Sequence, residues 1–446
     1  MASFTASGCL SLLKSSNPFT LPSVARLMIW VLLGALGGAG CQRSESYTQI
    51  RFWAMGREGE LVRQLLPEFE RRHPAIRVVV QQLPWSAAHE KLLTAFVGET
   101  MPDVFQLGNT WIPEFAALGA LAPLDARIAD SATLARAELF PGVVATNVID
   151  GVTYGVPWYV DTRLFFYRTD VLAAAGYAEP PRTWAEWLEA LRAVKREVGP
   201  DRYALLLPFN EWQALVILAL QQGSELLRDD ARYGAFDSPE FRAAFEFYVQ
   251  LFREGLAPAL GAGQVANLYQ DFARGFINVY VSGPWNIAEF ASRLPAEQQP
   301  HWGTAPLPGG GQDYPGPSLA GGASLVLLGT SPHQDAAWKL IEFLSEPEQQ
   351  TRFYQLSGDL PASRRAWRDA ALDQDRHAAA FWQQLQALRE TPKIPEWERI
   401  AELIARHSER VVRGSASMDD ALAALDRDVD RLLEKRRWLL ARKATQ

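Results

Sequence analysis

Strand-like and helix-like segments alternate along the chain from residue 49 onward. The strand-like segments are residues 49–54, 76–83 and 103–107, and the helix-like segments are residues 61–69, 86–97 and 110–118. Repeated strand–helix–strand units build parallel sheets with helices on their faces, so the pattern predicts an α/β fold. In such sheets ligands meet the loops at the carboxyl ends of the strands, which are residues 53–58 and 108–111 here.

A second block of the same kind begins after residue 170. Thr183 and Glu186 have the spacing of a capping box, and Ser238 followed by Pro239 is a second helix start. Strands are expected over residues 204–207, 276–282 and 323–328, and the chain from residue 331 onward reads as nearly all helical. The second block therefore predicts a second α/β lobe.

The composition is that of a globular protein, and the N-terminus is that of an exported one. The chain has 446 residues, of which 48% are hydrophobic and 21% charged, enough for two or more cores. Residues 1–26 carry Lys14, Arg26 and no acid, and residues 27–40 are apolar, which predicts a secretory signal peptide over residues 1–40. Removing it changes the formal net charge from −7 to −9, because two cations and no anions leave. A chain this acidic is not expected to bind nucleic acid.

The segment from Tyr154 to Asp170 combines aromatic rings with a carboxylate at the start of a strand. Trp158 and Tyr159 offer flat apolar faces to the C–H side of a pyranose, and Asp161 can accept hydrogen bonds from neighbouring hydroxyls. Residues 164–167 are expected in the core of a strand, whereas a buried Asp161 would need a partner. The segment is therefore a candidate sugar-binding element.

Five blocks of the sequence together resemble the family 1 extracellular solute-binding proteins of bacterial ATP-driven importers, the maltose-binding-protein-like family. The blocks are residues 102–111, 154–170, 276–285, 321–325 and 336–344. Residues 38–41 (Gly-Ala-Gly-Cys) also resemble a lipobox, in which Cys41 would be lipidated. Cys9 lies in the predicted signal peptide, so Cys41 would be the single cysteine of the mature chain.

The resemblance implies a type II periplasmic-binding-protein fold of two lobes, each a mainly parallel sheet flanked by helices, with three hinge crossings. The first lobe is expected to hold residues 49–157 and 284–328, and the second lobe residues 158–283 and 329–446. Residues 41–48 would be the tether. The crossings are expected near residues 156–161, 280–283 and 328–331.

The resemblance also implies a set of ligand contacts in the loops that face the cleft. The alternatives are structural roles: charges that open a solvated helix for Arg57 and Glu58, a helix cap for Asn109 or Thr110, core packing for Trp158, and a plain turn for Gly321 and Gly322. Trp397 lies out of register with the corresponding aromatic of the family. The implied ligand-binding residues are Arg57, Glu58, Asn109, Thr110, Trp111, Trp158, Tyr159, Asp161, Glu211, Trp285, Gly321, Gly322 and Trp397.

These features predict the lipid-anchored, monomeric binding component of an ABC importer. It would lie on the periplasmic or cell-surface side of the membrane, bind a mono- or oligosaccharide between its lobes and deliver it to the permease subunits, without enzyme activity, cofactor or metal. Two alternatives remain open at this point. The same fold could bind another solute such as a glycerol phosphate or a polyamine, or the carboxylates Glu58, Asp161 and Glu211 could serve a secreted carbohydrate-active enzyme.

Overall fold

The computed structural model describes residues 47–311 and 313–443, and residues 47–446 form one compact unit. The predicted signal peptide, the predicted lipidation site Cys41 and residues 41–46 of the predicted tether lie outside the described residues. Within the described part, no helix has the length and apolar character that a membrane span requires.

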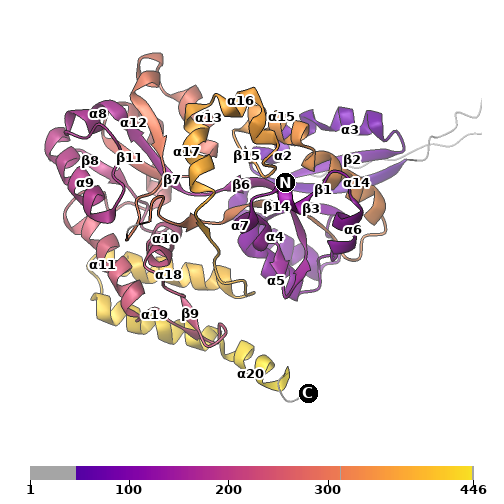
Figure 1. Ribbon diagram of the computed structural model, residues 1–446. Helices are drawn as coiled ribbons and strands as arrows, with labels where there is room; N and C mark the ends of the chain where they lie inside the picture. Colours follow the sequence, from indigo (N-terminus) through magenta and orange to yellow (C-terminus); the bar gives the residue numbers. More distant parts are fainter. Residues whose placement is uncertain (1–46, 312, 444–446) are drawn as a thin grey trace, which may run out of the picture. The chain divides into compact units, whose positions relative to one another are not determined.

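A six-stranded sheet, in the order β15-β6-β14-β3-β1-β2, is the centre of the first lobe. Its strands are β1 (Thr48–Met55), β2 (Ile76–Leu83), β3 (Val104–Gly108), β6 (Gly155–Asp161), β14 (Gly321–Leu327) and β15 (Leu360–Pro361). Apolar side chains cover both faces, because Phe52 belongs to one buried cluster and its neighbour Trp53 to another. Figure 1 shows helices α3 (Leu66–Arg72) and α4 (Trp85–Val97) on either side of these strands.

A four-stranded sheet, in the order β12-β7-β11-β8, is the centre of the second lobe. Its strands are β7 (Leu164–Arg168), β8 (Tyr203–Leu206), β11 (Ile277–Ser282) and β12 (Trp302–Ala305). One buried cluster covers the face that carries Phe165, and another covers the face that carries Phe166. The two neighbours of one strand thus point into separate cores, as the alternation of a strand requires.

Both sheets are mixed, which corrects the expectation of mainly parallel sheets. In the first sheet β1 pairs in parallel with β2 and β3, but β14 pairs antiparallel with β3 and β6, and β15 antiparallel with β6. In the second sheet β8 and β11 are parallel, and β7 is antiparallel to β11 and β12. Two of the reversed strands, β7 and β14, are those through which the chain enters one lobe from the other. Each begins at the edge of its sheet where the neighbouring strand ends, Leu164 opposite Ser282 and Ala323 opposite Gly108.

The chain passes between the two sheets three times within residues 47–443, and two of the three predicted positions are wrong. The first crossing joins β6 to β7, next to the predicted position. The second joins β12 to β14 rather than following β11, and the third follows β15 rather than β14.

The predicted lobe boundaries change accordingly. Residues 285–305 belong to the second lobe, because β12 pairs with β7 and Phe290 packs on Phe166 at a centroid distance of 5.0 Å. Helix α14 (Gln334–Ser345) belongs to the first lobe, because Leu340 and Phe343 lie in the core of the first sheet.

The helices begin where local chemistry favours them. The capping box at helix α9 (Trp184–Val198) is formed, since the Glu186 N–H donates to Thr183 Oγ1 at 3.2 Å and the Thr183 N–H donates to Glu186 at 3.2 Å. Ser238 caps helix α11 (Pro239–Arg253). The other helices that bear on the site are α2 (Glu58–Leu61), the 3-10 turn η2 (Asn109–Trp111), α5 (Ile112–Ala117), α10 (Gln213–Gln221), α12 (Leu268–Ala273), α13 (Trp285–Arg293), α15 (Pro347–Ser357) and α18 (Trp397–Val412).

Candidate functional site

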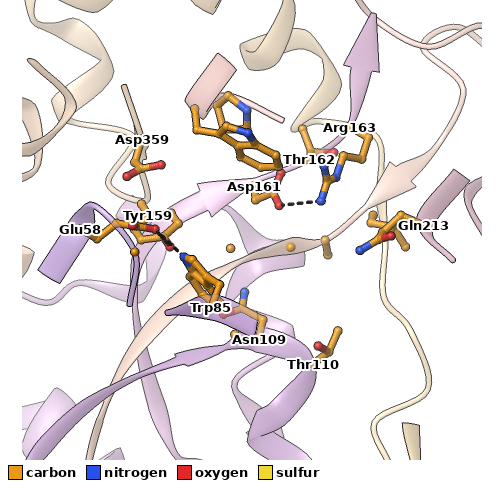
Figure 2. A pocket seen from close by; sticks show the side chains of 18 of the residues that line it. Glu58, Trp85, Asn109, Thr110, Tyr159, Asp161, Thr162, Arg163, Gln213 and Asp359 are labelled. Carbon is orange, nitrogen blue, oxygen red and sulfur yellow. Dashed lines mark hydrogen bonds and ion pairs between the residues drawn. The ribbon is translucent and has the colours of Figure 1, made fainter. Parts of the chain in front are cut away.

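A cavity of about 580 Å³ lies where the two sheets face each other, and both lobes line it. This volume is within the usual range of small-molecule sites. Ten of the thirteen sequence-predicted contact residues line it: Arg57, Glu58, Asn109, Thr110, Trp111, Tyr159, Asp161, Trp285, Gly321 and Gly322. Figure 2 shows Glu58, Tyr159 and Trp85 at one end, the Asp161 and Arg163 pair in the middle and Gln213 at the other end. Below, this cavity is called the cleft.

The first-lobe wall of the cleft contains a hydrogen-bonded chain of side chains. Gln106 is fully buried on β3, and its Oε1 accepts from the Met55 N–H at 2.8 Å. Its Nε2 therefore faces Tyr159 and donates to the Tyr159 hydroxyl at 2.8 Å. That hydroxyl in turn donates to Glu58 Oε1 at 2.8 Å. The direction of the whole chain follows from the Met55 N–H, because a backbone amide can only donate.

Glu58 also receives a hydrogen bond from the Trp85 indole Nε1 at 3.2 Å. Burial raises the pKa of Glu58 above its ordinary value, and the hydrogen bonds from Tyr159 and Trp85 partly offset that effect. Burial also raises the pKa of Tyr159, and the carboxylate of Glu58 adds to the rise. Glu58 is therefore held as a hydrogen-bond acceptor at the edge of the cleft.

Indole rings form the next part of the first-lobe wall. Trp85 and Trp111 meet edge to face with centroids 5.7 Å apart, and His89 meets Trp111 at 5.1 Å. His89 Nε2 lies 2.6 Å from Glu114 Oε2, and this hydrogen bond raises the pKa of His89. The carboxylate thus fixes the imidazole that supports Trp111.

Asn109 follows β3 at the floor of the cleft and is 4% exposed. Its Oδ1 accepts a hydrogen bond from the Ser324 hydroxyl at 2.9 Å, whereas Nδ2 has no partner. The side chain makes no cap hydrogen bond to the 3-10 turn that it begins. A buried donor without a partner is costly, which makes Asn109 Nδ2 a candidate ligand contact.

The first crossing brings a carboxylate, a guanidinium group and an indole together. Arg163 Nη2 lies 3.6 Å from Asp161 Oδ2, and the Arg163 guanidinium carbon lies 4.6 Å from the centroid of the Trp285 ring. Asp161 Oδ1 is buried and has no hydrogen-bond partner. Burial raises the pKa of Asp161, and Arg163 partly offsets the rise.

Gly283 is required at this junction. A Cβ there would lie 2.0 Å from Cζ3 of the Trp285 ring and 2.6 Å from Asp161 Oδ1. The glycine lets the ring lie against the backbone beside the carboxylate.

The second-lobe wall exposes more unpartnered polar atoms to the cleft. Gln213 Oε1 at the start of α10 and Glu398 Oε1 on α18 are buried without hydrogen-bond partners, as is Thr162 Oγ1 at the crossing. Burial raises the pKa of Glu398, and the Thr110 side chain across the cleft partly offsets it. These atoms face the same cavity as Asn109 Nδ2 and Asp161 Oδ1.

An ion pair joins the two walls. Arg57 in the loop after β1 binds Glu289 of α13 at 2.9 Å, and Glu289 also pairs with Arg293. Arg57 is 58% exposed and Glu289 is 14% exposed, so the pair lies at the rim of the cleft.

Gly321 and Gly322 line the cleft as predicted, but their conformational freedom serves the sheet. Gly322 has a φ of +128°, and a Cβ there would lie 2.4 Å from the Tyr159 carbonyl oxygen. A Cβ at Gly321 would lie 2.9 Å from the Asp161 carbonyl oxygen. The β6–β14 register shifts next to Pro157, which lacks an N–H, and the glycines allow close approach beyond that bulge.

Three predicted contact residues do not line the cleft. Trp158 is 1% exposed and stacks on Phe353 at 4.5 Å in the first-lobe core, because neighbouring residues of a strand point to opposite faces. Trp397 is fully buried and packs edge to face on Trp212 at 5.4 Å. Glu211 lies behind the cleft, where burial raises its pKa and Arg163 partly offsets the rise.

Several cleft residues were missed from the sequence. Trp85 is not among the predicted contacts, although its place just after β2, at the carboxyl end of a parallel strand, was a usable signal. Arg163 stands two residues after Asp161, and the charged pair in an otherwise apolar segment was a second signal. The others had no local pattern, since they come from helix starts and loops far apart in the chain: Thr162, Gln213, Tyr269, Glu289, Ser357, Asp359, Thr391 and Glu398.

The cleft as a whole is acidic and aromatic. Its lining contains five acidic side chains (Glu58, Asp161, Glu289, Asp359 and Glu398) and two guanidinium groups (Arg57 and Arg163). Both guanidinium groups are already engaged, one with Glu289 and one with Asp161 and Trp285. The described residues contain no group of three or more His, Cys, Asp or Glu side chains placed to hold a metal ion. The arrangement suits a hydroxyl-rich ligand without negative charge.

Comparison with known proteins agrees with this geometry. Residues 55–351 match the family model described as bacterial extracellular solute-binding protein. The solved structure of the sugar-binding protein MalE from Xanthomonas citri is 50% identical, covers 88% of this chain and 99% of its own, and superposes with a TM-score of 0.84.

Two more distant relatives also have names that refer to saccharides. The diacetylchitobiose-binding protein DasA of Streptomyces coelicolor is 26% identical over 80% of this chain and 83% of its own length. The maltotriose-binding protein of Pyrococcus abyssi is 25% identical over 76% of this chain and 71% of its own length. Because the family model matches more than half of this chain, the chain belongs to the bacterial extracellular solute-binding proteins.

Proposed function

We propose that the cleft binds a neutral mono- or oligosaccharide and that the protein delivers it to the permease subunits of an ABC importer. The observation that carries this proposal is the set of buried, unpartnered donor and acceptor atoms in an aromatic-walled cavity. The atoms are Asn109 Nδ2, Asp161 Oδ1, Thr162 Oγ1, Gln213 Oε1 and Glu398 Oε1. The names of the sugar-binding relatives support the same ligand class.

The chemistry of a sugar fits these groups. A pyranose has hydroxyls that both donate and accept, so one ring can satisfy Asn109 Nδ2 and Asp161 Oδ1 together. A carboxylate that accepts from a hydroxyl forms a charge-assisted bond, roughly twice as strong as a neutral one. The apolar C–H face of the ring can pack on Trp85, Trp111 or Trp285, which line the same cavity.

Ligand binding would stabilise the closed arrangement of the lobes. A ligand shifts a conformational equilibrium only by its preference for one state, so it must touch both walls. Asn109 belongs to the first lobe and Gln213 and Glu398 to the second, so one ligand can bridge them. We further propose that Cys41 carries a lipid that holds the protein, as a monomer, at the periplasmic or outer side of the membrane.

A thermal-shift screen of the purified protein tests the ligand class. Because a ligand that binds only the native state raises its stability, neutral saccharides should raise the melting temperature in a concentration-dependent way. Glycerol 3-phosphate should leave it unchanged, because the ionised carboxylates of the cleft repel a phosphate and both guanidinium groups are occupied. A shift with phosphates or polyamines but not with sugars would contradict the proposal.

The proposal also holds that the protein binds without turnover. The direct check is incubation with oligosaccharides followed by a reducing-end assay. New reducing ends that accumulate beyond one per protein molecule, and that disappear in Asp161→Asn or Glu58→Gln protein, would instead indicate a glycosidase.

A further inference from the structure

Asp359 is a buried acid that sequence reasoning did not select. It lies between helix α15 and strand β15, is 5% exposed and lines the cleft. Figure 2 shows it beside the Glu58 and Tyr159 pair. Its backbone N–H donates to the Ser357 hydroxyl at 3.0 Å, which fixes the loop that carries it.

The hydrogen-bonded chain of the first-lobe wall decides which of the two neighbouring acids is ionised. Met55 N–H, Gln106 and the Tyr159 hydroxyl donate in series, and the last bond ends on Glu58. Trp85 donates to the same carboxylate oxygen. Glu58 thus receives two hydrogen bonds as an acceptor, the role that favours its ionised form.

No comparable support reaches the Asp359 carboxyl group. Among the described residues no ion pair includes it, and the cation that acts on it, Arg57, is bound to Glu289. Burial, Glu58 and Asp161 all raise the pKa of Asp359, and Ser357 and Arg57 offset only part of the rise. Helix α13 packs against this loop through Ala288, which faces Gly358, and its acid Glu289 is paired with Arg57 and Arg293. The two acids that act on Asp359, Glu58 and Asp161, therefore both favour its neutral form.

We propose that Asp359 is a neutral carboxylic acid whose O–H donates a hydrogen bond to an acceptor oxygen of the bound saccharide, so that Asp359 is a specificity-determining residue of the cleft. This inference rests on the proposed function. It gives the acidic end of the cleft one fixed acceptor, Glu58, and one fixed donor, Asp359. Such a pair matches two neighbouring oxygens of a sugar, one donating and one accepting.

Matched variants and a pH series test the assignment. The affinity for the best saccharide of the thermal-shift screen is measured by calorimetry between roughly pH 5 and pH 9, above the ordinary carboxyl pKa of about 4. In the unaltered protein the affinity should fall as pH rises through the pKa of Asp359, because the ionised group cannot donate. Asp359→Asn keeps a neutral donor, so its affinity should stay within a few-fold of the unaltered protein at low pH and should not show this fall as pH rises. Asp359→Ala should bind the saccharide with roughly tenfold lower affinity.

The opposite pattern would overturn the assignment. If Asp359→Asn weakens binding as much as Asp359→Ala and the affinity of the unaltered protein does not fall with pH, then Asp359 is an ionised acceptor. An unchanged affinity in Asp359→Ala would show that the residue makes no hydrogen bond to the ligand. Absence of any saccharide binding by the unaltered protein would instead defeat the proposed function, and with it the assigned role.

Stability supplies a readout that needs no ligand. A carboxyl whose pKa is higher in the folded than in the unfolded state makes the free energy of unfolding decline as pH rises between the two values. Other buried acids, among them Asp161 and Glu398, also have raised pKa values and contribute to such a decline. Urea titrations should therefore show a steeper decline in the unaltered protein than in Asp359→Asn. Parallel pH profiles of the two proteins would contradict a neutral Asp359.

Discussion

The two walls of the cleft are built differently. On the first-lobe wall the polar groups mostly satisfy one another, since Gln106, Tyr159 and Glu58 form one directed chain. At the first crossing and on the second-lobe wall, Asp161 Oδ1, Thr162 Oγ1, Gln213 Oε1 and Glu398 Oε1 are buried and unpartnered. Asn109 combines both features, because its Oδ1 accepts a hydrogen bond from Ser324 and its Nδ2 has no partner.

This difference separates the two roles that a binding site must fill. A wall whose groups bond one another is rigid and contributes to folding stability. A wall whose groups lack partners costs stability and is completed by the ligand. Substitutions on the two sides should therefore be distinguishable: those on the first wall should lower stability, and those at the crossing should lower affinity alone.

The largest loss of affinity is expected for Asp161→Ala. Each hydrogen bond to a charged group contributes about 1.5 to 3 kcal/mol, or roughly 10- to 150-fold in the dissociation constant. Because Oδ1 has no protein partner and Oδ2 makes only the 3.6 Å pair with Arg163, the free energy of unfolding should fall by no more than about 1 kcal/mol. Calorimetry and urea unfolding measure the two quantities, with Asp201→Ala, an exposed acid away from the cleft, as the control. A large loss of stability would place Asp161 with the structural wall.

Trp285→Ala should have the next largest effect, a loss of about 1 to 2 kcal/mol of binding free energy. The substitution removes a ring from the cleft and frees the Arg163 guanidinium that lies over it. Trp438→Ala, on the exposed C-terminal helix, is the matched control. Equal affinities of the two variants would show that Trp285 does not contribute to ligand binding.

Tyr159→Phe tests the first-lobe wall, where the substitution is expected to lower stability. The change leaves Gln106 Nε2 and Glu58 without a shared partner in a buried place, which should lower the free energy of unfolding by about 1 to 3 kcal/mol. Urea unfolding without ligand is the measurement. If Tyr159→Phe is as stable as the unaltered protein while Asp161→Ala is not, the proposed division between the walls is wrong.

Arg57→Ala should have the smallest effect. The Arg57–Glu289 pair joins the two walls at an exposed rim, where an ion pair contributes about 0 to 1 kcal/mol and is screened by salt. Calorimetry at low and high ionic strength should show a small loss of affinity that disappears in salt. The control is Glu189→Ala, which breaks an exposed ion pair with Arg192 away from the cleft. It should leave the affinity unchanged at both ionic strengths. A loss that persists in high salt would make Arg57 a direct ligand contact.

The first-lobe wall could be predicted from the sequence because the end of a strand is visible in its hydrophobic pattern. The carboxyl ends of β1 and β3 place Glu58 and Asn109 in the cleft, as parallel strands require. The same reasoning failed at Trp158, where adjacent residues of one strand were both assigned to the ligand although strands alternate their faces.

The second wall and the lobe boundaries depended on long-range contacts that no local pattern reports. Trp302 pairs with Arg168 across β12 and β7, which places residues 285–305 in the second lobe. Asp359 and Glu398 reach the cleft from a loop and a helix start, and only folding brings them beside Glu58 and Thr110. Burial, rather than sequence position, distinguishes them from the many acids at the surface.

The most direct test is a calorimetric titration with a matched pair of ligands, a neutral saccharide that binds and its phosphate ester. The cleft is rich in carboxylates, and Arg57 and Arg163 are already paired. We therefore predict saturable binding of the neutral sugar and binding of the ester at least roughly tenfold weaker, because the ester brings a negative charge close to ionised carboxylates. Equal or tighter binding of the ester would contradict the account.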